Sequence, residues 1–572
     1  MSGECLACAY LRVMPVASSS RLVRWWPLSL ILLLLPMWCV GIFGRGYWTP
    51  DEPRAADIAW NMTYQQHKSV PEMAGVARCE NPPLAYWASG LSLSVLGQTP
   101  SAARLPNILW AIITVLSVAW LAYGMAGAGA ALVAGIAVGT FSLSYQAAIW
   151  LASDAPMVAG SCVALLGAFR GVTGTNSRDK LRWYSVMHVG LAGSFMAMGL
   201  VGWLVPMCAL SGFIIWERRW REVLRWELYA GMLLQACVVA PWILALADQP
   251  EGSRFLKIFF YDNLVGHFLL GHFFPGFIGA GQHEGQGSLP GMYLMKLPAY
   301  LAPWLFLAAA AIRRAWMGCR NISGDLAAWR WITCATVPAL LLLSASTTAR
   351  GLQLAPVMPG FALAIALWAA RHLAAPDRFE RMCLWATAGL IALAAMAVGP
   401  GCLMLAGLSG FTLDDQTTMA VVVGGLAAGV LGGKVLFQQR RGAAIAALAT
   451  AVLALNVTVL VAWRGAFPQF DRRQDLTPTV RALVEVTQTH PLVLYQPDET
   501  IISYLDYLAD LRPPAVVDAA TAKAALLTEP NRLLLVRIDH HEVTPLREVG
   551  LREVQVFEIP HGRTYALYGI AP

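Results

Sequence analysis

Apolar stretches long enough to cross a bilayer recur along most of this chain, and they constrain its fold more than any other feature. A transmembrane helix needs about 20 mostly apolar residues. Such stretches occupy 27–44, 104–123, 155–170, 228–246, 293–312, 331–343, 354–370, 384–408, 419–437 and 443–463. Apolar residues make up 57% and charged residues 13% of the 572 positions, a balance outside that of soluble globular chains. The sequence predicts an α-helical polytopic membrane protein with about 13–15 transmembrane helices by the length rule.

The net charge of +7 reports topology rather than a nucleic-acid partner. The basic residues form short clusters between apolar stretches, at 178–182, 218–225, 313–320, 371–381 and 434–441. Clusters of this kind mark cytoplasmic loops. The polar segments at about 45–82 and 248–291 are then external, and so is Asp154, which one apolar stretch separates from the cluster at 178–182.

Local patterns predict the shape of several segments. Ala55, Ile58, Ala59 and Met62 recur at helical spacing, which indicates an amphipathic helix lying on the membrane surface. The segment 126–150 starts and finishes outside, so we expect two short helices broken near Gly135 or Gly139. The segment 184–216 is predicted to be a hairpin that turns at Gly199 and Gly202.

The sequence pattern changes after Trp463 from long apolar stretches to short strand-like and helix-like runs. This change divides the chain into a transmembrane domain (1–464) and a soluble α/β domain (465–572). Residues 491–495 and 532–536 read as strands, and 477–486 and 519–527 as helices. A domain of this size is ordinary. By parity of the crossings it lies outside.

Two motifs of the first loop carry the chemical signal. TPDEPR (49–54) is followed by CENPPLAYW (79–87) and then by AARLP (102–106). This pattern resembles the first loop of the bacterial aminoarabinose transferases and related undecaprenyl-phosphate-dependent glycosyltransferases of the GT-C superfamily. The resemblance is good over 45–110 and looser beyond, through SDAP (153–156), DNLVGHF (262–268) and LAPVMPG (354–360). It implies an inner-membrane enzyme with a periplasmic C-terminal domain. It also implies inverting transfer of a sugar from undecaprenyl phosphate to an outer-leaflet lipid such as lipid A.

The resemblance implies that Asp51 and Asp154 are the catalytic carboxylates. Sugar transfer passes through an oxocarbenium-like state, so a carboxylate can accept a proton from a hydroxyl nucleophile or balance the developing positive charge. Where the acceptor is an ionised phosphate, orientation is the remaining role. The alternative for both residues is helix capping, because each stands at the predicted start of a helix.

A divalent metal, of which zinc is the example, is implied at Glu80 together with His283 from the later external loop. Carboxylate and imidazole are reasonable zinc ligands, although two ligands do not close a structural site. Solvated or hydrogen-bonded loop residues are the alternative.

This chain departs from the resembling family at Asn81, where relatives carry a lysine, so a phosphate-binding cation is missing. Arg54, Arg78, His267 and Arg350 are the candidates that replace it, since guanidinium groups suit phosphate. Glu52, Asn81 and Tyr86 complete the predicted substrate-binding set. Structural support by Glu52 and interfacial anchoring by Tyr86 are the alternatives.

Two other functions stay open at this point. One is a protein-directed polyprenyl-phosphate sugar transferase, since a superfamily does not fix the acceptor. The other is a catalytically silent lipid-binding or transport protein. Transporters carry charges near the bilayer midplane, whereas the informative charges of this chain cluster outside.

Overall fold

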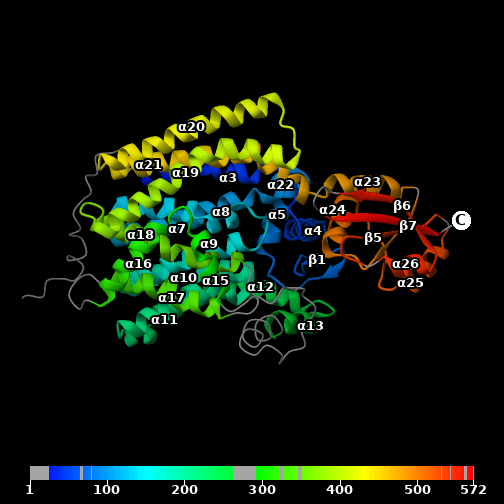
Figure 1. Cartoon of the computed structure of the whole chain (residues 1–572). Coiled ribbons are helices and arrows are strands. Elements are labelled where there is room, and N and C mark those ends of the chain that lie inside the picture. The colour runs from blue at the N-terminus through cyan, green and yellow to red at the C-terminus, as the bar shows by residue number, and fades with distance from the viewer. Residues whose placement is uncertain are drawn as a thin grey trace, which may run out of the picture.

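The computed structural model describes residues 25–64, 68–78, 80–261, 291–320, 327–345, 351–488, 490–529, 531–541, 543–558 and 563–570. A bundle of α-helices and a small α/β domain at one end of it make up this part of the chain (Figure 1). The helices before the α/β domain are α3 (Trp26–Ile42), α4 (Asp51–Tyr64), α5 (Leu84–Leu96), α6 (Pro100–Arg104), α7 (Pro106–Thr140), α8 (Ser142–Ile149), α9 (Asp154–Thr173), α10 (Ser177–Met198), η1 (Gly199–Trp203), α11 (Leu204–Trp216), η2 (Trp220–Leu224), α12 (Trp226–Ala247), α13 (Gly252–Leu256), α15 (Met292–Tyr300), α16 (Leu305–Arg320), α17 (Ala327–Ser344), η4 (Gly351–Val357), α18 (Met358–His372), α19 (Arg378–Ser409), α20 (Asp415–Arg440) and α21 (Ala444–Gly465).

Within the described ranges, nine helical stretches are long and apolar enough to cross a membrane, or ten if the bent pair of α15 and α16 counts as one span. Two of the nine, Pro100–Thr140 and Ser177–Trp216, are 41 and 40 residues long. At about 1.5 Å per residue each measures about 60 Å, roughly twice the thickness of the hydrocarbon core. Neither is therefore a single crossing.

The first long stretch folds back on itself inside α7. The helix is interrupted at Gly127, whose φ is +81°. A Cβ built on Gly139 would lie 3.3 Å from Val115, so the two halves of α7 pack side by side.

The predicted break near Gly135 or Gly139 occurs at Phe141, between α7 and α8. The prediction that 126–150 starts and finishes on one side is wrong, because Tyr123 stacks on Trp26 at the start of α3 whereas Trp150 packs on Trp48 beyond its end. Gly135 and Gly139 themselves lie inside the second half of α7, where a missing side chain lets α3 approach: a Cβ on Gly135 would lie 2.5 Å from Leu30.

The second long stretch is the predicted hairpin. It turns at Gly199, with φ +64°, through the short helix η1 between α10 and α11. Lys180 near the start of α10 lies 2.8 Å from Glu222, which follows α11, so both helices reach the same end of the bundle. Each of the two long stretches counts as two crossings, so the nine stretches supply 11 crossings in the described residues. Helix α3 and the bent pair of α15 and α16 add one each, which gives 13, the lower end of the predicted range.

The C-terminal domain is built on a five-stranded sheet of order β4-β3-β5-β7-β6. β4, β3 and β5 are parallel, and β7 and β6 add an antiparallel edge. Its predicted strands and helices are confirmed. The elements are α22 (Phe467–Gln474), α23 (Thr477–Thr487), β3 (Leu492–Tyr495), α24 (Glu499–Ala509), β4 (Ala515–Val516), α25 (Ala519–Leu527), β5 (Leu533–Arg537), α26 (Thr544–Glu548), β6 (Leu551–Glu558) and β7 (Thr564–Ile570).

The two faces of this sheet serve different cores. Successive side chains of a strand point to opposite faces. Leu492 and Leu494 of β3 join a hydrophobic cluster that contains residues of the first loop, whereas Val493 and Tyr495 join a cluster confined to the C-terminal domain. Both faces are covered, which explains why β3 is buried at every position.

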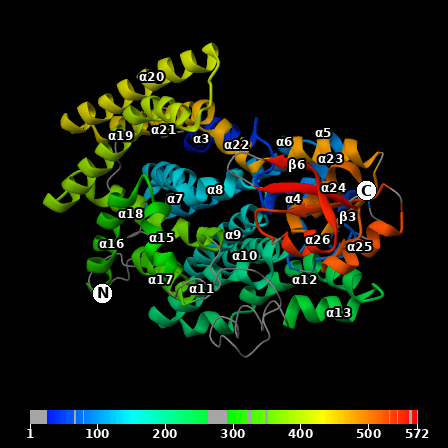
Figure 2. The ribbon, with the colours of Figure 1, turned by 45° about the vertical axis from the view of Figure 1, so that its right-hand side comes forward.

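Helix α4 forms as predicted, but its surroundings differ from the prediction of a membrane-surface helix. Ile58, Ala59 and Met62 are buried in one core with Tyr504 and Leu505 of α24. Figures 1 and 2 show α4 between the helix bundle and the C-terminal domain. The same apolar stripe suits a protein core as well as a bilayer, and its periodicity does not distinguish the two.

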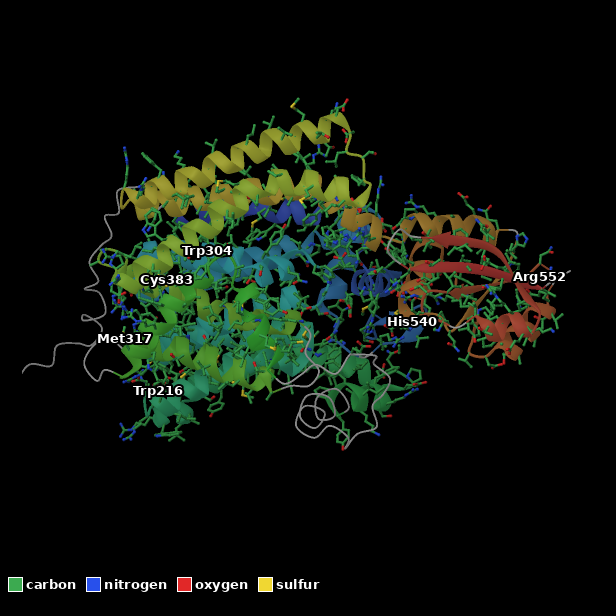
Figure 3. The ribbon with its side chains drawn as sticks, viewed as in Figure 1. Trp216, Trp304, Met317, Cys383, His540 and Arg552 are labelled. Atoms are coloured by element: carbon green, nitrogen blue, oxygen red, sulfur yellow. The ribbon has the colours of Figure 1, made fainter. Side chains whose placement is uncertain are left out.

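The C-terminal domain and the basic clusters lie at opposite ends of the molecule. In Figure 3, Trp216, Met317 and Cys383 lie at one end, and His540 and Arg552 lie in the domain at the other. The three former residues are sequence neighbours of basic clusters. This separation is what the positive-inside rule requires of a chain with its C-terminal domain outside.

Labelling of single cysteines tests this topology. In a cysteine-free background, we expect Val517→Cys to react with a membrane-impermeant maleimide in intact spheroplasts, because Val517 is 72% exposed in the C-terminal domain. Arg440→Cys, at the opposite end, is expected to react only after lysis. Reaction of the two variants with the reverse pattern would invert the topology.

Candidate functional site

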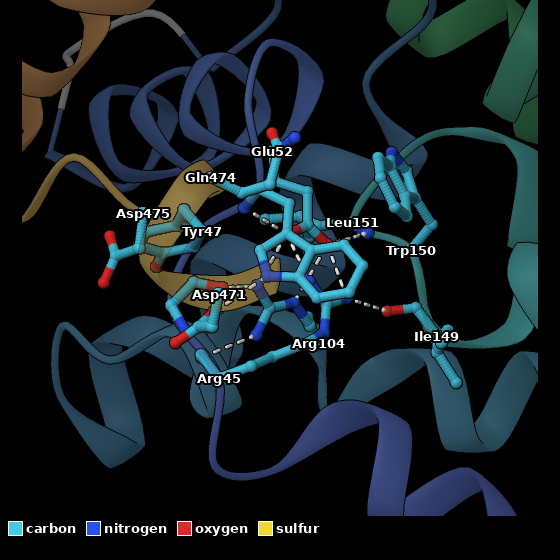
Figure 4. A network of polar contacts seen from close by, with 12 residues as sticks. Arg45, Tyr47, Glu52, Arg104, Ile149, Trp150, Leu151, Asp471, Gln474 and Asp475 are labelled. Atoms are coloured by element: carbon cyan, nitrogen blue, oxygen red, sulfur yellow. Dashed lines mark hydrogen bonds and ion pairs between the residues drawn. The ribbon is translucent and has the colours of Figure 1, made fainter. Parts of the chain in front are cut away.

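Glu52 organises the start of the first loop, defined here as residues 45–82. Arg45 and Arg104 each donate two hydrogen bonds to its carboxylate, at 2.6–3.0 Å (Figure 4). The main-chain N–H groups of Trp48 and Leu151 donate two more, at 2.8 and 3.0 Å. The side chain of Glu52 has no exposed surface. This network ties the first loop to α6 and to the segment after α8.

The electrostatics of Glu52 fit this supporting role. Burial raises the pKa of a carboxyl group, but the guanidinium groups of Arg104 and Arg45 outweigh it and lower the pKa of Glu52 to about 2. The carboxylate therefore stays ionised and fully hydrogen-bonded. Sequence reasoning placed Glu52 among the substrate-binding residues; in the fold its oxygens serve the loop rather than a ligand.

Asp51, one residue earlier, has the opposite environment: it is exposed, whereas Glu52 is buried. It is the first residue of α4. Within the described ranges, its carboxylate has no hydrogen bond or ion pair, and no capping contact from it accompanies the start of α4. A free carboxylate next to a rigidly held residue is available to a ligand.

Four side chains beside Asp51 form a cluster of alternating charge, called here the charge cluster: Arg54, Arg78, Glu80 and Glu499. Arg54 lies 2.5 Å from Glu80 and 3.3 Å from Glu499, and Arg78 lies 2.8 Å from the other oxygen of Glu499. Burial lowers the pKa of Arg54, and Glu80 more than offsets this, so its pKa is raised. Arg54 stays charged.

The charge cluster has one donor that its own members do not use. The Nε–H of Arg78 is buried, and in the part of the chain that the structure describes it has no hydrogen-bond acceptor. A buried donor without an acceptor costs stability. An anionic oxygen is the natural partner for it.

Tyr86 connects the second motif to the start of α9. Its side chain is buried, which raises the pKa of its phenol; the charge of Arg54 and hydrogen bonds with Asn81 and Ser153 lower it. Asp154 follows Ser153 as the buried first residue of α9. The fold thus brings Arg54, Glu80, Asn81, Tyr86 and Asp154 into one neighbourhood.

Three predicted site residues, His267, His283 and Arg350, lie outside the described residues. The predicted metal pair of Glu80 and His283 is therefore represented by Glu80 alone. Among the described residues, no group of three or more His, Cys, Asp or Glu side chains is arranged to hold a metal ion.

Sequence reasoning missed three residues of this region. Arg104 lies in the AARLP motif and Arg45 at the start of the loop, so their charge in otherwise apolar surroundings was a usable signal. Glu499 carried no such signal. It stands over 400 residues after Arg54 and acts only through the docking of α24.

Sequence comparisons relate this chain to known sugar transferases. A family model described as dolichyl-phosphate-mannose-protein mannosyltransferase matches residues 80–244. The undecaprenyl phosphate-alpha-4-amino-4-deoxy-L-arabinose arabinosyl transferase of Edwardsiella ictaluri is 26% identical over 60% of this chain and 58% of its own length. The enzyme of that name from Erwinia tasmaniensis is 28% identical over 56% of this chain and 55% of its length. The matches thus span less than two thirds of these relatives.

Solved structures show the fold. The crystal structure of ArnT from Cupriavidus metallidurans bound to undecaprenyl phosphate has a TM-score of 0.69 at 18% identity, over 95% of this chain and 98% of that one. Its apo state has a TM-score of 0.70. The oligosaccharyltransferase of Archaeoglobus fulgidus has a TM-score of 0.51 at 10% identity, over 90% of this chain and 70% of that one. This chain therefore has the GT-C fold and resembles the aminoarabinose transferases in sequence.

Proposed function

We propose that this chain is an inverting glycosyltransferase that moves a sugar from an undecaprenyl-phosphate carrier to a lipid acceptor such as lipid A, at the periplasmic face of the bacterial inner membrane. The observation that carries the proposal is the exposed carboxylate of Asp51 at the start of α4, one residue before the buried Glu52 and three before Arg54 of the charge cluster. The named activity of the relatives supports it.

The proposed reaction assigns a task to each part of the site. The acceptor oxygen attacks the anomeric carbon while the bond from that carbon to the carrier phosphate breaks. Asp51 orients the acceptor or takes its proton, and Asp154 supplies a second carboxylate nearby. Arg54 and Arg78 bind the carrier phosphate in place of the lysine absent at Asn81, together with His267 and Arg350.

A zinc ion at Glu80 and His283 remains part of the proposal. Carboxylate and imidazole are ligands that zinc accepts, and Glu80 lies in the charge cluster, 2.5 Å from Arg54. Such an ion would add positive charge beside the phosphate.

Mass spectrometry of lipid A and of surface glycans from cells with and without this gene tests the function. A lipid A mass difference equal to one sugar supports the proposal. Unchanged lipid A with altered glycoproteins would favour the protein-directed transferase instead. No change in either would favour the silent lipid-binding protein.

Two substitutions in the charge cluster are expected to change phosphate binding in opposite directions. Arg54→Gln removes a charge-assisted contact and should weaken binding of undecaprenyl phosphate about 10- to 100-fold, from about 1.5–3 kcal/mol. Glu499→Gln removes the carboxylate that occupies Arg54 and Arg78, so it should tighten binding. Titration of purified protein with this lipid measures both.

The control for this pair is Arg532→Gln. Arg532 is ion-paired with Glu529 inside the C-terminal domain, at 2.6 Å, so its loss should leave phosphate binding unchanged. If Arg54→Gln bound the lipid as tightly as the wild type, the assignment of Arg54 to phosphate binding would be wrong.

A further inference from the structure

Two buried carboxyl groups meet where the C-terminal domain docks on α4. Asp57 of α4 is 0% exposed and Asp506 of α24 is 4% exposed. The side-chain amide of Asn61 donates to both, at 3.0 Å to Asp57 and 2.9 Å to Asp506. The reaction proposed above uses neither residue.

The donors around the pair are too few for two negative charges. Asp57 accepts a hydrogen bond from the main-chain N–H of Ala74, at 3.1 Å, and Asp506 accepts one from Arg512, at 2.7 Å. Among the described residues, one guanidinium, that of Arg512, therefore faces two carboxyl groups. The same Asn61 nitrogen holds both carboxyl groups, and a hydrogen bond between them contributes to the raised pKa of Asp57. Because an ionised carboxylate has no donor, that bond requires a proton.

The proton belongs on Asp57. Burial and the charge of Asp506 raise the pKa of Asp57 to about 9, against the lowering effects of the Ala74 N–H and of Arg512. Asp506 keeps the direct contact with Arg512. Among the described residues, the other titratable groups near the pair are Tyr507, whose pKa an ionised Asp57 would raise, and the exposed Asp510, 3.9 Å from Arg512.

We infer that the C-terminal domain is latched to α4 by one proton shared between Asp57 and Asp506, and that the latch weakens as the pH rises. This inference is independent of the proposed function. Separation of the two helices exposes both carboxyl groups to water, where each ionises near pH 4. Between about pH 4 and pH 9 the separated state releases a proton that the docked state keeps, so docking weakens by up to about tenfold per pH unit.

The latch acts on the charge cluster because the two share helices. Arg54 lies one turn before Asp57 on α4, and Glu499 begins α24, which carries Asp506. Loosening of this contact withdraws Glu499 from Arg54 and Arg78. Extracytoplasmic pH would thereby set the state of the candidate site.

Hydrogen–deuterium exchange of the full chain in lipid nanodiscs tests the latch. Protection of peptides from α4 and α24, corrected for the intrinsic exchange rate, should fall between pH 6 and pH 8 by up to about tenfold per unit. Asp57→Asn puts an N–H donor where the shared proton lies, so it should remove this slope. Asp506→Asn should remove it as well.

Asp510→Asn is the matched control. Asp510 is an aspartate at the end of α24 with a side chain that is 91% exposed, so its loss should leave the wild-type slope intact. A wild-type protection that does not change with pH would overturn the inference, whether or not the variants fold. An undiminished slope in both Asp57→Asn and Asp506→Asn would overturn it too.

Discussion

Asp51→Asn is expected to lower sugar transfer by about 100- to 10,000-fold, the range that a positioned proton-transfer group contributes. The amide has the shape of the carboxylate but neither its charge nor its basicity. Because Asp51 is exposed and its side chain makes no hydrogen bond or ion pair with the described residues, the variant should fold normally. Product formation by purified protein with an undecaprenyl-phosphate-linked sugar donor measures the effect.

The thermal unfolding midpoint of the same preparation is the control for Asp51→Asn. An unchanged midpoint with lost activity assigns the residue to the reaction. Wild-type activity in this variant would remove the catalytic role of Asp51. Loss of activity together with a large drop in the midpoint would instead indicate a structural role.

Glu52→Gln is expected to destabilise the fold by about 3–5 kcal/mol, the cost of removing one partner from a buried ion pair. The change leaves Arg45 and Arg104 without a counter-charge, and their side chains are 1% and 0% exposed. We expect a large fall in the unfolding midpoint, measured by intrinsic fluorescence. The two adjacent carboxyl groups thus have different predicted phenotypes. Asp51→Asn should lose activity without losing stability, whereas Glu52→Gln should lose stability.

The comparison for Glu52→Gln is Glu251→Gln. Glu251 pairs with Arg254 at 2.7 Å, but the two side chains are 55% and 70% exposed. Exposed pairs contribute about 0–1 kcal/mol, so the midpoint should hardly change. Equal midpoints for the two variants would contradict the assigned role of Glu52.

The local parts of the fold could be predicted from the sequence because their physical causes are local. Apolar length marks the spans, and a change in periodicity marks the C-terminal domain. Gly199 was predicted correctly as a turn and a break near Gly139 occurs at Phe141, whereas the turn at Gly127 was not predicted. Gly127 and Gly135 are both glycines in apolar surroundings, and only the packing of Leu30 against the second half of α7 distinguishes the close contact at Gly135 from the turn at Gly127.

The residues of the candidate site also divide into those that could be predicted from the sequence and those that could not. Asp51, Arg54 and Glu80 could be found because they lie in motifs of one loop. Glu499 and the pair of Asp57 with Asp506 could not, since they depend on how a distant domain docks on α4. The apolar face of α4 predicts that something covers it, but not whether lipid or protein does so.

The shared core of α4 and α24 also sets an order of events during synthesis. The chain emerges from the N-terminus, and roughly 400 residues separate α4 from the domain that covers its apolar face. Because chains are synthesised at about 5–20 residues per second, the C-terminal domain follows α4 after an interval on the order of 20–80 s. During this interval Ile58, Ala59 and Met62 lack the residues of the C-terminal domain that complete their core, among them Tyr504 and Leu505. The first loop therefore matures last, and a nascent chain that stalls before α24 carries the exposed apolar stripe that chaperones and proteases recognise.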